Sequence, residues 1–204
     1  MLLYGLSLIY GIAGSTSYAE IYESFSGGTA DFELALVLGL ALIVGGIGFK
    51  ASAVPFHMWT PDAYEGAPLP ITAFLSATSK AATFALLMRV FGGPLLPVID
   101  DWQWMMASIA VLTMAFGNLI ALQQSNIKRL LAYSSIGQVG FMLMAVTAIS
   151  HDTSSALLLH LAGYLTTNLA VFTGLCIKGM SIKPPFFYAA YAVCMAGVNG
   201  SSTH

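Results

Sequence analysis

Charged residues are scarce in this sequence. Only 8% of its 204 residues are Asp, Glu, Lys or Arg, whereas 57% are hydrophobic. A soluble domain carries about 25% charged residues, so this composition excludes an ordinary soluble domain and favours a membrane protein. The formal net charge is −2 and the seven Lys and Arg residues form no basic cluster. The sequence therefore gives no sign of a nucleic-acid partner and predicts the lipid bilayer as its surroundings.

Cysteine is also scarce, and the common cofactor motifs are missing. The two cysteines, Cys176 and Cys194, have no CxxC or Cys/His spacing. We interpret them as small apolar residues, not as metal ligands or a disulfide. No GxGxxG, P-loop, CxxCH or HExxH motif occurs. We therefore expect no cofactor, metal ion or redox centre in this chain.

Long apolar runs predict an all-α, polytopic bundle of transmembrane helices with about six spans. The first run, MLLYGLSLIYGIAGS, lacks the positive charges of a signal peptide and is too short to cross a bilayer. We interpret it as the second half of a helix. A run at 186–198 is also too short to span. The apolar runs behind the predicted bundle are 1–14, read as half of a span, and 32–64, 70–92, 105–123, 130–149 and 155–177.

The connectors between these runs differ in charge according to their side of the membrane. Those after the first, third and fifth runs carry acidic residues and no Lys or Arg. Those after the fourth and sixth runs carry only cations. The positive-inside rule then predicts that connectors 124–130 and 178–185 face the cytoplasm or its equivalent compartment. The cations are Lys128, Arg129, Lys178 and Lys183.

The run 32–64 predicts a discontinuous helix. As one helix its 33 residues would reach about 50 Å, which is too long for ordinary tilt. Pro55 removes a backbone donor in its interior and clashes with the preceding turn. We predict two halves, roughly 32–50 and 55–65, with the interruption near Lys50 to Pro55. Irregular backbone at membrane depth is tolerated only where protein or a water-filled cavity surrounds it.

Two lysines lie inside predicted spans. Lys80 is near the middle of the run 70–92, and Lys50 is beside the interruption. A lysine at mid-membrane costs about 2.5–3.5 kcal/mol on insertion scales, so two of them require an explanation. One explanation is a proton or ion site, because burial disfavours the charged form of a lysine and so eases proton exchange. The other is a structural ion pair whose acidic partner is not evident in the sequence.

His57 and three polar residues of the last span are further candidates. A histidine exchanges protons near neutral pH, so waters around the interruption would connect His57 with Lys50. The alternative is a histidine held by a structural hydrogen bond. His160, Tyr164 and Asn168 follow i, i+4, i+8 spacing and share one helix face. Packing between helices and binding of relay waters both remain open for these three.

Two stretches resemble a known family. They are GFKASAVPFHMWTPDAYEGAPLPITAFLSATSKAATFALLMRVF and NIKRLLAYSSIGQVGFMLMAV. They are similar to the antiporter-like membrane subunit N (subunit 2) of NADH–quinone oxidoreductase, respiratory complex I, and the resemblance covers about residues 1–178. The sequence AYSSIGQ is most similar to that of cyanobacterial or plastid-type members.

The resemblance implies a fold and a site. Its members have about fourteen helices in two inverted repeats, each with discontinuous helices at its centre. Lys50 matches the lysine of the broken helix, which pairs with a glutamate in the family. Lys80 matches the connecting lysine on the next helix, and His57 matches the histidine of the VPFH motif. The residues selected from burial and charge are therefore the ones that the resemblance implies.

The implied function is proton pumping coupled to electron transfer from NAD(P)H to quinone. NAD(P)H, FMN, Fe–S clusters and quinone would be bound by other subunits, and the partners would be other membrane subunits of the complex. The implied location is the bacterial plasma membrane, or a thylakoid or inner organelle membrane. Two alternatives remain: a subunit of a multi-subunit cation/proton antiporter, and a structural membrane subunit whose lysines do not transfer protons.

The sequence departs from the family at its two ends. It does not contain the glutamate that pairs with the broken-helix lysine, or the exit lysine of a second broken helix. Residues 179–204 stop resembling the family. We therefore expect a partial proton-translocating domain at 1–178 followed by a divergent tail, as a truncated or frameshifted gene would produce.

Overall fold

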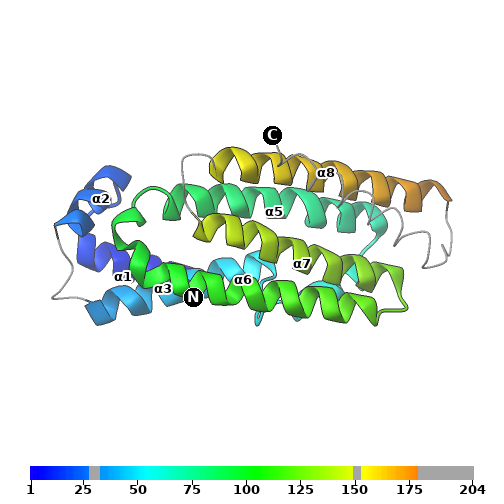
Figure 1. Ribbon diagram of the computed structural model, residues 1–204, viewed down its shortest axis with the longest axis horizontal. Helices are drawn as coiled ribbons and strands as arrows, with labels where there is room; N and C mark the ends of the chain where they lie inside the picture. Colours follow the sequence, from blue (N-terminus) through cyan, green and yellow to red (C-terminus); the bar gives the residue numbers. More distant parts are fainter. Residues whose placement is uncertain (28–32, 149–152, 179–204) are drawn as a thin grey trace.

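The computed structural model describes residues 1–27, 33–148 and 153–178, with side chains as far as Leu175. The tail 179–204 and Cys194 lie outside the described residues, so the predicted domain boundary stays a prediction. Within the described ranges the chain forms helices and no strand, and the longest helices run side by side along the long axis (Figure 1). The helices are α1 (Leu2–Ala13), α2 (Tyr18–Ser26), α3 (Glu33–Ala51), α4 (Trp59–Gly66), α5 (Leu69–Phe91), α6 (Ile99–Leu122), α7 (Ile127–Thr147) and α8 (Thr153–Lys178), with a 3₁₀ turn, η2 (Leu96–Val98), before α6.

Five of the described helices, α3 and α5 to α8, are long and apolar enough to cross a membrane. This confirms the predicted all-α, polytopic fold. The first predicted run, 1–14, forms α1, which has 12 residues and packs against the middle of α3. Helix α2 was not predicted. Its spacing of Ile21 and Phe25, which are both buried, was the available signal, since residues four apart share one helix face.

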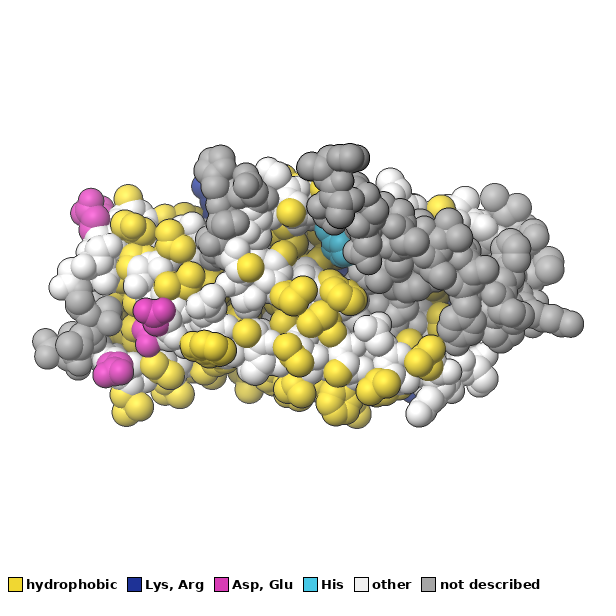
Figure 2. Space-filling model, in the orientation of Figure 1, with side chains coloured by type: hydrophobic (Ala, Val, Ile, Leu, Met, Phe, Trp, Pro, Cys, Tyr) yellow, Lys and Arg dark blue, Asp and Glu magenta, His cyan; other side chains and the backbone are white. Residues whose placement is uncertain are grey.

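The interior of the bundle is mainly apolar but contains a set of buried polar side chains, and its outer surface is apolar. Buried polar side chains lie on α5 to α7, among them Thr83, Thr113 and Gln138, whereas large apolar side chains cover the outer surface (Figure 2). Acidic side chains gather at the end of the molecule where α2 lies. Broad exposed apolar surface marks contact with a membrane or with protein partners, and on membrane-length helices it fits a lipid bilayer.

Small residues let neighbouring helices approach closely. Helices α6 and α7 cross at Gly117, where an added Cβ would lie 2.5 Å from the backbone nitrogen of Gly137. Helix α1 meets α3 in the same way, since a Cβ on Gly46 would lie 2.8 Å from the Cβ of Leu2. Close backbone approach through glycine is typical of helices packed within membranes.

The predicted interruption lies between α3 and α4. Ser52 has a left-handed backbone with φ of 69°. The Val54 N–H donates to the Thr113 hydroxyl on α6 at 3.0 Å, and the Thr60 hydroxyl donates to Ser52 Oγ at 2.6 Å. Side chains thus satisfy part of the backbone that leaves the helix. The second half begins at Trp59, four residues later than predicted, because residues 54–58 form turns before the helix begins.

Candidate functional site

Lys80 is buried at the centre of the bundle. It is 2% exposed, midway along α5. Its Nζ donates to the backbone oxygen and to the hydroxyl of Ser135 on α7, each at 2.8 Å. The ring centroid of Tyr164 on α8 lies 6.0 Å from Nζ, which is at the outer limit of a cation–π contact. Three helices therefore meet around one ammonium group.

The hydrogen-bond partners of Lys80 are neutral. In the described part of the chain the salt bridges are those of Arg129, and none involves Lys80. The structural ion pair considered from the sequence therefore has no described acidic partner. A serine hydroxyl both accepts and donates hydrogen bonds, so it can accept from an ammonium and can turn to donate to an amine. This environment suits a lysine that exchanges its proton.

His57 lies in the interruption and is 8% exposed. Its ring approaches Tyr133 of α7 edge-on, with centroids 6.4 Å apart. Its Nδ1 is buried and makes no hydrogen bond of good geometry to a described residue, although the ring lies within reach of the Pro55 backbone. A water molecule would complete the hydrogen bonding of such a nitrogen.

Lys50 differs from Lys80 in its exposure. It lies in the last turn of α3 and is exposed, although both lysines were predicted to be buried. The reason is its helix face. Lys50 follows Gly46 by four residues, and Gly46 contacts Leu2 at the beginning of α1. In the last turn of α3, Ile47 and Ala51 are buried, whereas Lys50 lies on the face beyond the contact with α1 and is exposed.

The three candidates on α8 face the interior of the bundle. The Tyr164 hydroxyl donates to the backbone oxygen of Ser76 at 3.1 Å, and His160 Nε2 lies 3.1 Å from Gln138 Oε1. These contacts join α8 to α5 and α7, as packing between helices requires. Asn168 Nδ2 is buried without a partner in the described ranges. A relay role for these three residues stays a prediction.

Two residues of the site, Ser135 and Tyr64, were not selected from the sequence. Tyr64 is 1% exposed on α4, and its side chain is in hydrogen-bonding contact with Ser135. No described contact joins Lys50, His57 and Lys80 directly, so Tyr64 and Ser135 extend the polar interior from α4 to Lys80.

The fold and the site define a class of protein. This is a multi-pass helical membrane protein with a discontinuous helix and a lysine buried midway along the next helix. The chain belongs to the family described as "NADH:quinone oxidoreductase/Mrp antiporter, TM", which it matches over residues 1–196, further than the resemblance to about residue 178 seen in the sequence.

Curated relatives carry two related names. The chain is 50% identical over 170 residues to "NADH-quinone oxidoreductase subunit N 2" of Rhizobium meliloti, which covers 83% of this chain and 35% of the relative. It is 38% identical over 212 residues to "NAD(P)H-quinone oxidoreductase subunit 2" of Crocosphaera subtropica. This match covers 97% of this chain and 41% of the relative. The chain therefore spans between a third and a half of the length of these relatives.

Solved structures share the fold. A chain of respiratory complex I from Thermus thermophilus with bound aureothin matches with a TM-score of 0.67 and 36% identity, over 84% of this chain and 35% of that one. A chain of the Mrp complex from Dietzia sp. DQ12-45-1b matches with a TM-score of 0.72 and 25% identity, over 84% of this chain and 31% of that one. Within the described residues, no group of three or more His, Cys, Asp or Glu side chains could hold a metal ion.

Proposed function

We propose that this chain is part of a proton-translocating membrane subunit of an NAD(P)H–quinone oxidoreductase. In this proposal electron transfer in other subunits drives proton transfer through Lys80, Lys50 and His57. The chain contributes to an oxidoreductase that is also a translocase, without holding a redox centre. The NAD(P)H, FMN, Fe–S clusters and quinone belong to partner subunits.

One observation carries the proposal: Lys80 is 2% exposed at mid-membrane depth and is held by neutral partners. A charge placed there is costly, so the presence of a lysine at this position supports a functional role. Names of relatives from Rhizobium meliloti and Crocosphaera subtropica support the assignment to an NAD(P)H–quinone oxidoreductase. The membrane would be a bacterial plasma membrane or a thylakoid membrane.

The test is to replace Lys50 by alanine in the full-length subunit within its assembled complex. NADH–quinone reductase turnover and proton uptake are measured in the same membrane vesicles. We expect both to fall severalfold at an unchanged amount of complex, because Lys50 lies at the entrance to the interruption. Arg89→Gln is the control, since Arg89 is exposed and contacts the ring of Tyr18. Unchanged turnover and proton uptake in Lys50→Ala would contradict a role for Lys50.

A cation/proton antiporter subunit is a second candidate. The match to the Mrp complex chain, with a TM-score of 0.72, favours it. The two candidates differ in their driving reaction. Proton uptake that requires NADH and quinone, and that does not change when sodium is replaced by choline, supports the oxidoreductase. Proton exchange that requires sodium and no electron donor supports the antiporter.

A further inference from the structure

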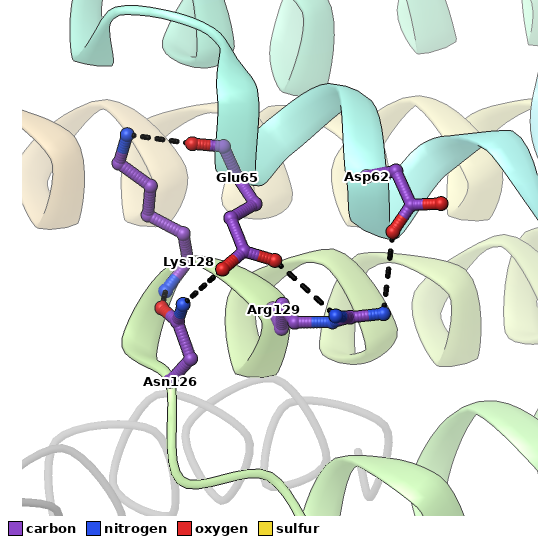
Figure 3. A network of polar contacts seen from close by, with 5 residues as sticks. All are labelled: Asp62, Glu65, Asn126, Lys128 and Arg129. Carbon is purple, nitrogen blue, oxygen red and sulfur yellow. Dashed lines mark hydrogen bonds and ion pairs between the residues drawn. The ribbon is translucent and has the colours of Figure 1, made fainter.

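A group of charged and polar side chains fastens α4 to α7, and we call it the α4–α7 clamp (Figure 3). The Arg129 guanidinium reaches Asp62 Oδ1 at 3.2 Å with one nitrogen and Glu65 Oε2 at 3.3 Å with the other. Asn126 Nδ2 donates to Glu65 Oε1 at 2.8 Å. The fifth member, Lys128, donates from Nζ to the backbone oxygen of Glu65 at 3.0 Å.

The clamp also completes the C-terminal end of α4. Lys128 Nζ donates to the backbone oxygens of Glu65 and Ala67, each at 3.0 Å. The last carbonyls of a helix have no partner within the helix, and a cation there is favoured by the helix dipole. Asn126 caps the beginning of α7 as well, because its Oδ1 accepts from the Lys128 backbone N–H at 3.0 Å. One cluster thus joins the end of α4 to the beginning of α7.

Helix α4 depends on such external contacts. It has eight residues, and no side chain caps its N-terminus. A helix of this length is not stable in isolation. Its preceding segment is the interruption, which leaves the entry to α4 irregular over residues 52–58. The depth and rotation of α4 are therefore set by what it packs against, which is chiefly α7.

Two contacts of the candidate site cross the same interface. Tyr64 of α4 is in hydrogen-bonding contact with Ser135, which also binds Lys80 Nζ. His57, just before α4, meets the ring of Tyr133 on α7. A rotation of α4 against α7 would separate both pairs, so the position of α4 decides whether the polar interior is continuous.

Stability alone does not explain the clamp. The side chains of Arg129, Asp62 and Glu65 are 38%, 74% and 42% exposed, and exposed ion pairs contribute little to folding. Their geometry instead defines position. Asp62 and Glu65 are three residues apart on one face of α4, and a planar guanidinium joins two carboxylates at once in a way that a lysine ammonium does not reproduce.

We propose that Arg129 is a positioning residue for proton transfer. By bridging Asp62 and Glu65 it fixes the rotation of α4 against α7 and so keeps Tyr64 at Ser135, beside Lys80. This inference rests on the proposed function and adds a residue at the membrane surface to it. Arg129 does not itself exchange protons with the site.

The test uses the full-length subunit in its assembled complex and measures protons taken up per NADH oxidised in vesicles. The variants are Arg129→Gln, Glu65→Gln, the double variant, and Arg89→Gln as an exposed arginine away from the clamp. Because the ratio is expressed per turnover, a loss of complex through poor folding does not change it. We expect the ratio to fall at least twofold in Arg129→Gln and to stay at the wild-type value in Arg89→Gln.

The double variant shows whether the two charges act together. If they form one clamp, the double variant has about the same ratio as Arg129→Gln, because the contact is already lost. Independent, additive losses would overturn the proposal, and so would a wild-type ratio in Arg129→Gln. If the complex that carries Arg129→Gln does not assemble, the proton ratios of Arg129→Lys and Glu65→Gln test the proposal. A lowered ratio in both supports the proposal, and a wild-type ratio in both overturns it.

A Lys80→Met variant separates this inference from the proposed function. If Lys80→Met lowers the proton ratio and Arg129→Gln does not, only the positioning role of Arg129 is wrong. If Lys80→Met keeps the wild-type ratio, the proposed function fails, whatever the Arg129 variants show.

Discussion

Replacing Gly117 by alanine tests the link between helix packing and the site. The added Cβ would lie 2.5 Å from the backbone nitrogen of Gly137 and 2.8 Å from its Cα. Ordinary carbon contacts are about 3.5–4.0 Å, so α6 and α7 would have to separate by about 1 Å at this crossing. The opposing atoms belong to the backbone and cannot turn aside. Overpacking of this kind costs about 1–3 kcal/mol.

The same displacement reaches Lys80. Ser135 is two residues from Gly137 on α7, and it holds Lys80 Nζ through two bonds of 2.8 Å. A shift of about 1 Å would lengthen these donor–acceptor distances beyond about 3.5 Å, where a hydrogen bond is lost. We therefore expect Gly117→Ala to lower both the thermal stability of the subunit and the rate of coupled quinone reduction.

The assay compares Gly117→Ala with Gly174→Ala. Gly174 is a matched control because a Cβ there, on spanning helix α8, would meet no atom within 4 Å. We expect the melting temperature to fall by several degrees for Gly117→Ala, since 1 kcal/mol corresponds to about 2–4 °C for a chain of this size. Gly174→Ala should match wild type. A wild-type melting temperature and turnover for Gly117→Ala would refute the close packing of α6 and α7.

Two further predictions concern single hydrogen bonds. Ser135→Ala removes one of the two acceptors of the buried ammonium, and a bond to a charged donor contributes about 1.5–3 kcal/mol. We expect coupled turnover to fall about tenfold, with Ser134→Ala as the neighbouring control, and an equal rate in both variants would contradict the site. Thr113→Val removes the hydroxyl that accepts a buried backbone N–H of the interruption, which costs about 1–3 kcal/mol. We expect a lower melting temperature for Thr113→Val. Thr166→Val is the control and should match wild type, because the Thr166 hydroxyl bonds only within its own helix, on an exposed face. Equal melting temperatures for the two variants would contradict the structure of the interruption.

Local patterns in the sequence predicted much of the fold. Apolar runs of membrane length predicted the spanning helices, and length together with Pro55 predicted the interruption. The position of Lys80 near the middle of the run 70–92, with about ten residues of that run on either side, predicted its burial. Each of these features depends on residues that are close together in the sequence, so each could be predicted from the sequence alone.

Features that depend on packing between distant segments were not predicted. The partner of Lys80 is Ser135, 55 residues away, and nothing local distinguishes it from Ser134. The exposure of Lys50 depends on where α1 ends its contact with α3. The α4–α7 clamp joins residues more than 60 positions apart, and no local pattern in the sequence pairs them.

The most direct test of the account replaces Lys80 by methionine, which keeps much of the side-chain volume and removes the charge. NADH oxidation and proton uptake are followed together in sealed vesicles that contain the assembled complex. The account predicts that proton uptake falls at least tenfold at a wild-type content of complex. Proton uptake and turnover at wild-type rates would contradict it and would leave Lys80 as a structural residue.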